Sequence, residues 1–129
     1  MARELIVTHA GAIIFGRTTS DAFSNVVYQI TDTDEGELSR ELLMEVRATL
    51  NNRRKDKQKE IDGYDMMMKC PTISYEDWIA NYNAQLEAMD ELDNIKDGMA
   101  WADTFKLMLS EMKCSEGNVD ITLRYLKSY

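Results

Sequence analysis

The sequence predicts an α+β fold, in which a small antiparallel sheet of three N-terminal strands and one C-terminal strand holds a long antiparallel helical hairpin inserted between them. Short β-favouring runs occupy residues 1–33, and an alternating apolar run lies near the C-terminus. The segment between them, residues 34–113, repeats its apolar residues at helical spacing. A terminal strand needs a pairing partner, so we expect the chain to close on its first sheet as a single domain, residues 1–129.

The N-terminal segment contains three candidate strands. Residues 5–8 and 12–16 are β-favouring runs on either side of a glycine-containing turn, which is typical of a hairpin. A third run, residues 26–31, alternates Val26, Tyr28 and Ile30 on one side, which indicates a third strand.

The first long helix is expected to begin near Asp34. Asp34 and Glu37 have the spacing of a capping box. Apolar residues then recur every four positions from Leu38 to Leu50, as on one face of a helix. Pro71 ends the region, because the residue before a proline disfavours helical geometry.

The second helix is expected to begin at Ser74, which is followed by Asp77 in a capping pattern. Apolar residues recur at helical spacing as far as Met112, interrupted by Gly98, so either one long helix or two shorter ones fits the sequence. The C-terminal strand is expected over residues 118–127, since Val119, Ile121, Leu123 and Tyr125 alternate with other residues.

The charges support the antiparallel hairpin. With 15 basic and 23 acidic residues the net charge is −8, yet residues 53–59 form a basic run. If the end of the first helix, near residue 69, lies level with the start of the second at Ser74, residue i of one helix faces residue 143 − i of the other. The basic run then faces residues 84–90 and their acidic side chains. Whether the basic run serves internal pairing or contacts a partner remains open at this level.

The apolar pattern predicts a homodimer. No strongly apolar residue lies between Leu50 and Ile61, whereas the facing helix carries Leu86, Met89 and Leu92. These three side chains need another surface to cover them, and a second copy of the chain is the simplest candidate.

Several function classes are disfavoured. The acidic charge opposes direct nucleic-acid binding. The absence of a signal peptide or of an apolar stretch long enough to cross a bilayer predicts a cytoplasmic protein without membrane contact. One histidine, His9, and two cysteines do not form a zinc site of nitrogen and sulfur ligands alone, and no nucleophile or phosphate-loop motif is present. We therefore expect no enzyme and no cofactor; a metal-dependent nucleotide hydrolase is the catalytic alternative, through carboxylates four residues apart on a helix.

The first functional hypothesis is a non-catalytic binding protein. Its acidic helical segment, residues 76–111, would occupy a basic surface of a protein partner. The chain is small, acidic and without a catalytic set, as accessory proteins of phages and mobile elements are, so an inhibitor of a host defence or nucleic-acid-handling factor is expected. The predicted partner-binding residues are Glu87, Asp90, Glu91, Asp93 and Asp97.

Two alternatives stay open. A receptor or sponge for a small anionic nucleotide would use Arg17, Thr18, Thr19 and Arg124, because arginine forks and hydroxyls beside a glycine bind anions, in a pocket of one chain or at a dimer interface. A structural subunit of a larger assembly is the other alternative.

Overall fold

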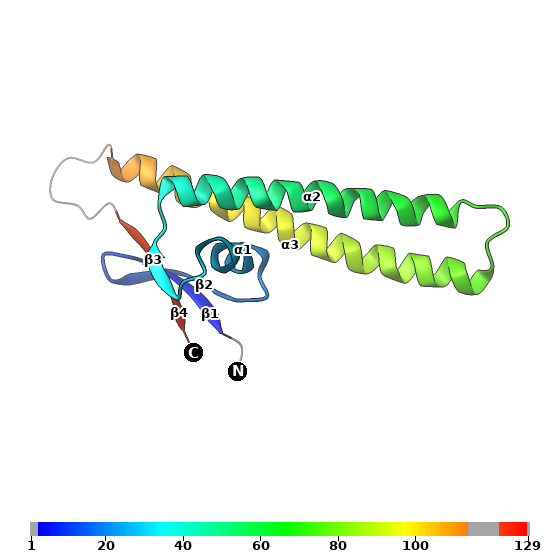
Figure 1. Ribbon diagram of the computed structural model, residues 1–129, viewed down its shortest axis with the longest axis horizontal. Coiled ribbons are helices and arrows are strands. Elements are labelled where there is room, and N and C mark those ends of the chain that lie inside the picture. The colour runs from blue at the N-terminus through cyan, green and yellow to red at the C-terminus, as the bar shows by residue number, and fades with distance from the viewer. Residues whose placement is uncertain (1–2, 114–121, 129) are drawn as a thin grey trace.

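The computed structural model describes residues 3–113 and 122–128. The elements are, in chain order, β1 (Glu4–His9), β2 (Ala12–Thr18), α1 (Ala22–Thr31), β3 (Glu35–Glu37), α2 (Arg40–Met68), α3 (Tyr75–Lys113) and β4 (Leu123–Ser128). The four strands form one antiparallel sheet in the order β2-β1-β4-β3. Helices α2 and α3 run side by side as a long hairpin, with the sheet and α1 beside one end of it (Figure 1). The predicted fold class is confirmed.

Strand β4 closes the chain by pairing with β1 on one side and β3 on the other. Its alternation is confirmed where the strand is described, because Leu123 and Tyr125 are buried and Arg124 is exposed. Val119 and Ile121, the other two predicted inward positions, lie outside the described residues.

The strand predicted over residues 26–31 is wrong, because this segment belongs to helix α1. Asp21 caps the helix by accepting hydrogen bonds from the amides of Phe23 (3.1 Å) and Ser24 (3.3 Å). Phe23, Val26 and Val27 are buried at a spacing of three and four residues, so helical burial prevails over the alternation. The third N-terminal strand is instead the short polar edge strand β3.

The predicted start of the first long helix at Asp34 is also wrong. Ser39 is the N-cap, and its hydroxyl accepts a hydrogen bond from the Leu42 amide at 3.1 Å. The preceding segment pairs with β4: the carbonyl of Asp34 accepts from the Lys127 amide, and Leu38 donates to Leu123, each at 2.7 Å. Strand pairing therefore occupies the Asp34 carbonyl and the Leu38 amide, which a helix beginning at Asp34 would have bonded to each other.

The second predicted start is confirmed. Ser74 precedes α3, and its hydroxyl accepts from the Asp77 amide at 3.1 Å. The helix then continues through Gly98 to Lys113 without interruption. A Cβ atom at Gly98 would lie 3.1 Å from the Phe23 amide nitrogen and 3.2 Å from Leu50 Cδ1. Gly98 thus permits α1 and α2 to approach α3 closely.

The main core lies between the sheet, α1 and the neighbouring halves of α2 and α3. Phe15, Phe23, Trp101 and Phe105 form an aromatic group whose neighbouring ring centroids lie 4.8–5.6 Å apart. These contacts join β2, α1 and α3, and so fix the root of the hairpin on the sheet.

Ser24→Ala is expected to raise the free energy of unfolding by about 1 kcal/mol. Ser24 is fully buried in α1, and its hydroxyl has no hydrogen-bond partner in the described parts of the chain, so alanine removes an unsatisfied polar group. Urea denaturation measures the change. Ser110→Ala is the control, since that helical serine donates to the Lys106 carbonyl at 3.1 Å. A smaller gain for Ser24→Ala than for Ser110→Ala would contradict the argument.

Candidate functional site

The far half of the hairpin has almost no core of its own. Ile61, Ala88 and Leu92 form a small buried cluster between α2 and α3, with Tyr64 packed against it. Beyond this cluster, no residue from 62 to 87 is buried. Helices in proteins gain most of their stability from packing of an apolar face. At this end of the hairpin the apolar side chains are not buried between the two helices, so they are available to a binding partner.

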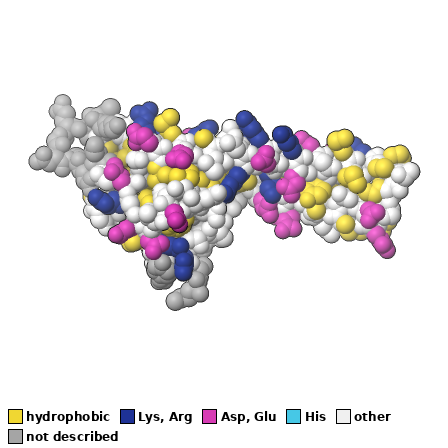
Figure 2. All heavy atoms as spheres, in the orientation of Figure 1, with side chains coloured by type: hydrophobic (Ala, Val, Ile, Leu, Met, Phe, Trp, Pro, Cys, Tyr) yellow, Lys and Arg dark blue, Asp and Glu magenta, His cyan; other side chains and the backbone are white. Residues whose placement is uncertain are grey.

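The same region carries the charge of the protein. Residues 60–97, which we call the arm, contain ten acidic and two basic residues, a net charge of −8 that equals the net charge of the whole chain. The rest of the chain is therefore neutral overall. Figure 2 shows hydrophobic side chains gathered over the far end of the arm.

The five predicted partner-binding residues are all exposed on α3. They do not form one cluster. With about 3.6 residues per helical turn, Glu87 and Glu91 lie on one side of α3, whereas Asp90, Asp93 and Asp97 lie about a third of a turn away. The two groups face different flanks of the arm.

The basic run meets α3 through Lys57. The Lys57 ammonium donates to Glu91 and lies 3.1 Å from a carboxylate oxygen of Glu60. The predicted register places Lys57 opposite Leu86, so the observed partner lies five residues further along α3. Helical side chains lean toward the N-terminus of their own helix, which in an antiparallel pair raises the sum of contacting residue numbers. Among the described residues, the predicted pairing of the basic run with acidic residues of α3 is confirmed for Lys57 alone, and its register is wrong.

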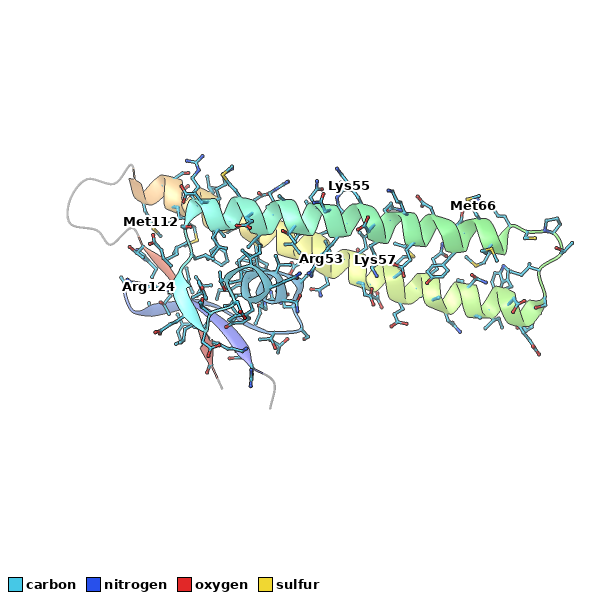
Figure 3. The ribbon with its side chains drawn as sticks, viewed as in Figure 1. Arg53, Lys55, Lys57, Met66, Met112 and Arg124 are labelled. Carbon is cyan, nitrogen blue, oxygen red and sulfur yellow. The ribbon has the colours of Figure 1, made fainter. Side chains whose placement is uncertain are left out.

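The remaining cations of the run have other roles. Arg53 donates to Asn25 at 3.1 Å and to Gln29, which ties α2 to α1. Arg54 donates to Asn51 within α2. Lys55 points away from α3, whereas Lys57 points toward it (Figure 3). The side chains of the run therefore do not act together: Lys57 contacts α3, Arg53 contacts α1, and Lys55 points away from α3.

The pKa of Lys57 is raised above its ordinary value. The hydrogen bond to Glu91 is the main cause, burial acts in the opposite direction, and Glu60 adds to the rise. A raised lysine pKa means that the charged pair persists through neutral pH and is lost only in strongly alkaline solution.

A groove follows the flank of the arm on which Lys57 and Glu91 meet. It consists of two hollows that share Glu60 and Tyr64. The hollow of about 560 Å³ nearer the tip is lined by Glu60, Gly63, Tyr64, Met66, Met67 and Asn81. The hollow of about 220 Å³ beside it is lined by Lys57, Glu60, Tyr64, Ala84, Glu87, Ala88 and Glu91. One half of the groove is thus largely apolar and the other is charged.

An exposed apolar stripe runs along the opposite side of α3. It consists of Tyr75, Trp78, Tyr82, Leu86 and Met89, all of which are exposed. The rings of Trp78 and Tyr82 stack with centroids 5.4 Å apart. Of the three side chains predicted to need cover, Leu86 and Met89 are exposed, while Leu92 packs on Ile61.

Sequence reasoning missed both the groove and the full stripe. The recurrence of apolar residues at helical spacing does not by itself separate Trp78 and Tyr82 from Leu92. A second apolar series, in which Ala88, Leu92 and Ile95 are spaced four and three residues apart, was the signal for the buried side. For the groove, the only feature of the sequence that indicates it is a glycine, Gly63, inside the helical region.

The residues predicted to bind a nucleotide are not brought together. Arg17 lies opposite Leu5 on the helix-covered face of the sheet, over the rings of Phe15 and Trp101. Arg124 lies on the other face, opposite Glu37. Strand β1 separates their two strands.

The four residues predicted to bind a nucleotide contact different neighbours. The hydroxyl of Thr18 lies 2.8 Å from that of Ser20, and the Thr19 amide donates to the Arg3 carbonyl. Arg124 lines a hollow of about 380 Å³ together with Glu35, whose carboxylate opposes an anionic ligand.

Cys70 lies exposed in the connection between α2 and α3, with its sulfur 3.3 Å from the Thr72 hydroxyl. Cys70 therefore does not belong to the core, and Cys114 lies outside the described residues. The hydrogen bond from the Thr72 side chain lowers the pKa of the Cys70 thiol, with a further contribution from the Thr72 backbone.

Thr72→Val is expected to slow alkylation of Cys70 by iodoacetamide severalfold at pH 7.5, about one unit below the ordinary thiol pKa. A lowered pKa increases the thiolate fraction at a given pH, so losing the hydroxyl decreases it. Measuring the alkylation rate against pH in a Cys114→Ser background isolates Cys70. An unchanged pH profile would show that the Thr72 hydroxyl does not stabilise the thiolate.

No family model, curated protein or solved structure matches this chain. Within residues 3–113 and 122–128, no group of three or more histidine, cysteine, aspartate or glutamate side chains has the arrangement of a metal site. None of the described helices combines the length and the apolarity needed to cross a membrane.

Proposed function

We propose that this chain is a non-catalytic binding protein whose arm docks on a basic surface of a protein partner. One observation carries the proposal: the arm holds the entire net charge of −8, yet no side chain between Ile61 and Ala88 is buried. The exposed side chains of the arm include the apolar stripe, and an exposed apolar patch is typical of interaction sites. A field of one sign steers an oppositely charged partner toward it.

The charge also indicates the class of partner. Surfaces that bind nucleic-acid phosphates are rich in lysine and arginine. An acidic arm can occupy such a surface and exclude the nucleic acid. We therefore assign the chain as an inhibitor, of the kind that phages and mobile elements encode, of a host defence or nucleic-acid-handling factor.

Neutralising Asp90, Glu91 and Asp93 together tests the proposal. The triple variant Asp90→Asn, Glu91→Gln, Asp93→Asn is expected to bind the partner about tenfold more weakly, because each exposed charge contributes up to about 1 kcal/mol. Its binding is also expected to depend less on salt. The partner is first captured from native cells with the unmodified chain, identified by mass spectrometry, and then titrated with each variant at low and high salt.

The matched control removes three acidic charges outside the arm. Glu37→Gln, Glu41→Gln and Glu45→Gln together change the net charge equally and leave the arm intact. The proposal requires that this control keep its affinity apart from a small long-range effect. Equal losses in the two triple variants would mean that net charge, not the arm, determines binding.

We further propose that a second copy of the chain covers the apolar stripe. The stripe residues are spaced by three, four, four and three positions, which is symmetrical about Tyr82. Two α3 helices related by a two-fold axis at Tyr82 would therefore place Tyr75 opposite Met89 and Trp78 opposite Leu86. Such self-complementarity is what an isologous dimer requires.

A further inference from the structure

We propose that the groove on the Lys57 flank of the arm receives a partner segment that presents one large apolar side chain and, about one to two helical turns from it, an arginine or lysine. This inference rests on the proposed function and specifies the chemistry of the partner. The apolar side chain enters the larger hollow, and the cation enters the smaller one.

Gly63 lines the larger hollow without placing a side chain in it. A Cβ atom at Gly63 would meet no atom within 4 Å, so this position of α2 opens directly into the hollow. Tyr64 and Met67 line it, and Met67 is 56% exposed. Methionine adapts its shape to an incoming apolar group, which makes this wall suited to a leucine, methionine or aromatic side chain.

The smaller hollow has more carboxylates than cations. Of the described residues that line it, Glu60, Glu87 and Glu91 are acidic and Lys57 is the only cation. Lys57 engages Glu60 and Glu91. Glu87 has no ion pair among the described residues, so a guanidinium or ammonium entering here would complete the pairing.

Charge selects the occupant. The two hollows share Glu60 and Tyr64, so they adjoin each other along α2. A partner helix presents side chains three or four residues apart on one face, which suits two adjoining hollows. A second copy of the arm would bring its own acidic residues against Glu60 and Glu87, which disfavours this chain as the occupant.

Gly63→Leu tests the groove. Leucine fills the larger hollow from α2, and it has a higher helix propensity than glycine, so the variant is expected to fold at least as stably. The probe is a library of random 12-residue peptides displayed and selected on the full unmodified chain. We expect enriched peptides to combine a large apolar residue with an arginine or lysine three to seven positions away, and to bind Gly63→Leu at least tenfold more weakly.

Two variants provide the controls. Asn52→Leu adds the same side chain at an exposed position of α2 outside the groove and is expected to bind the enriched peptides normally. Glu87→Gln is expected to keep the preference for the apolar residue but to lose most of the preference for the cation.

Two outcomes would overturn the inference. The first is equal binding of the enriched peptides to Gly63→Leu and to the unmodified chain. The second is loss of peptide binding in Trp78→Ala with full binding in Gly63→Leu, which would place the site on the stripe. Either result would overturn the groove but leave the acidic arm as the docking element. If selection on the unmodified chain does not enrich basic residues in the peptides, that result contradicts the proposed function as well.

Discussion

Gly98→Val is expected to destabilise the protein by about 2–3 kcal/mol, as overpacking of a close contact does. The contact involves the amide nitrogen of Phe23 at the start of α1, 3.1 Å from the position of an added Cβ, and Leu50 Cδ1 at 3.2 Å. The backbone of α1 cannot rotate away as a surface side chain can. Helix α1 is also fixed there by the Ala22 amide, which donates to Asn94 of α3 at 3.4 Å.

Gly63→Ala provides the matched control for this contact. Both glycines lie inside long helices, so alanine brings a similar gain of about 1 kcal/mol in helix propensity at each position. At Gly63 the added Cβ meets open space, whereas at Gly98 it meets Phe23 and Leu50. Gly63→Ala should therefore stabilise the protein and Gly98→Ala should not, as measured by urea denaturation. Equal gains from the two alanines would mean that α1 does not press on α3.

The fold could be predicted from the sequence where one pattern dominated. Strict alternation at Leu123 and Tyr125 and the cap at Ser74 each identified their element correctly. The prediction failed where two patterns competed. Val26 and Val27 are β-branched, and apolar residues recur at every second position from Val26, yet the cap at Asp21 and the burial of Val26 and Val27 make the segment helical. Tertiary packing, which a local pattern does not contain, determined the outcome.

The candidate site was predictable only in part for a similar reason. The acidic excess of α3 is a property of the sequence, so the exposure of Asp90 and its neighbours followed directly. The groove depends on which residue of α2 faces which residue of α3, and Lys57 meets Glu91, five residues beyond its predicted partner. Arg17 and Arg124 failed to meet because the sheet order places β1 between their strands and alternation places them on opposite faces.

Tyr82→Glu is expected to weaken self-association at least a hundredfold. In the proposed dimer Tyr82 lies on the two-fold axis, so one substitution places two carboxylates against each other at the centre of the interface. Loss of a central aromatic residue alone commonly costs more than 2 kcal/mol. Sedimentation equilibrium measures the dimer constant. Leu107→Glu is the control, because Leu107 is exposed on α3 far from the stripe.

Disulfide crosslinking locates the axis directly. In a background with Cys70→Ser and Cys114→Ser, Tyr82→Cys should crosslink to its own copy, because the two cysteines meet on the axis. Trp78→Cys and Leu86→Cys should each fail alone and crosslink when mixed. A Trp78→Cys variant that crosslinks efficiently with itself would exclude an antiparallel pairing centred at Tyr82.

Salt is expected to have opposite effects on binding at the two surfaces of the arm. The dimer brings together two arms that each carry a charge of −8, so screening should strengthen self-association. Docking on a basic partner brings opposite charges together, so the same salt should weaken it. The stripe and the groove lie on opposite sides of α3, since Ala84 and Glu91 are about half a turn from Tyr82. Gly63→Leu should therefore leave the dimer constant unchanged, and Tyr82→Glu should leave the groove able to bind its peptides.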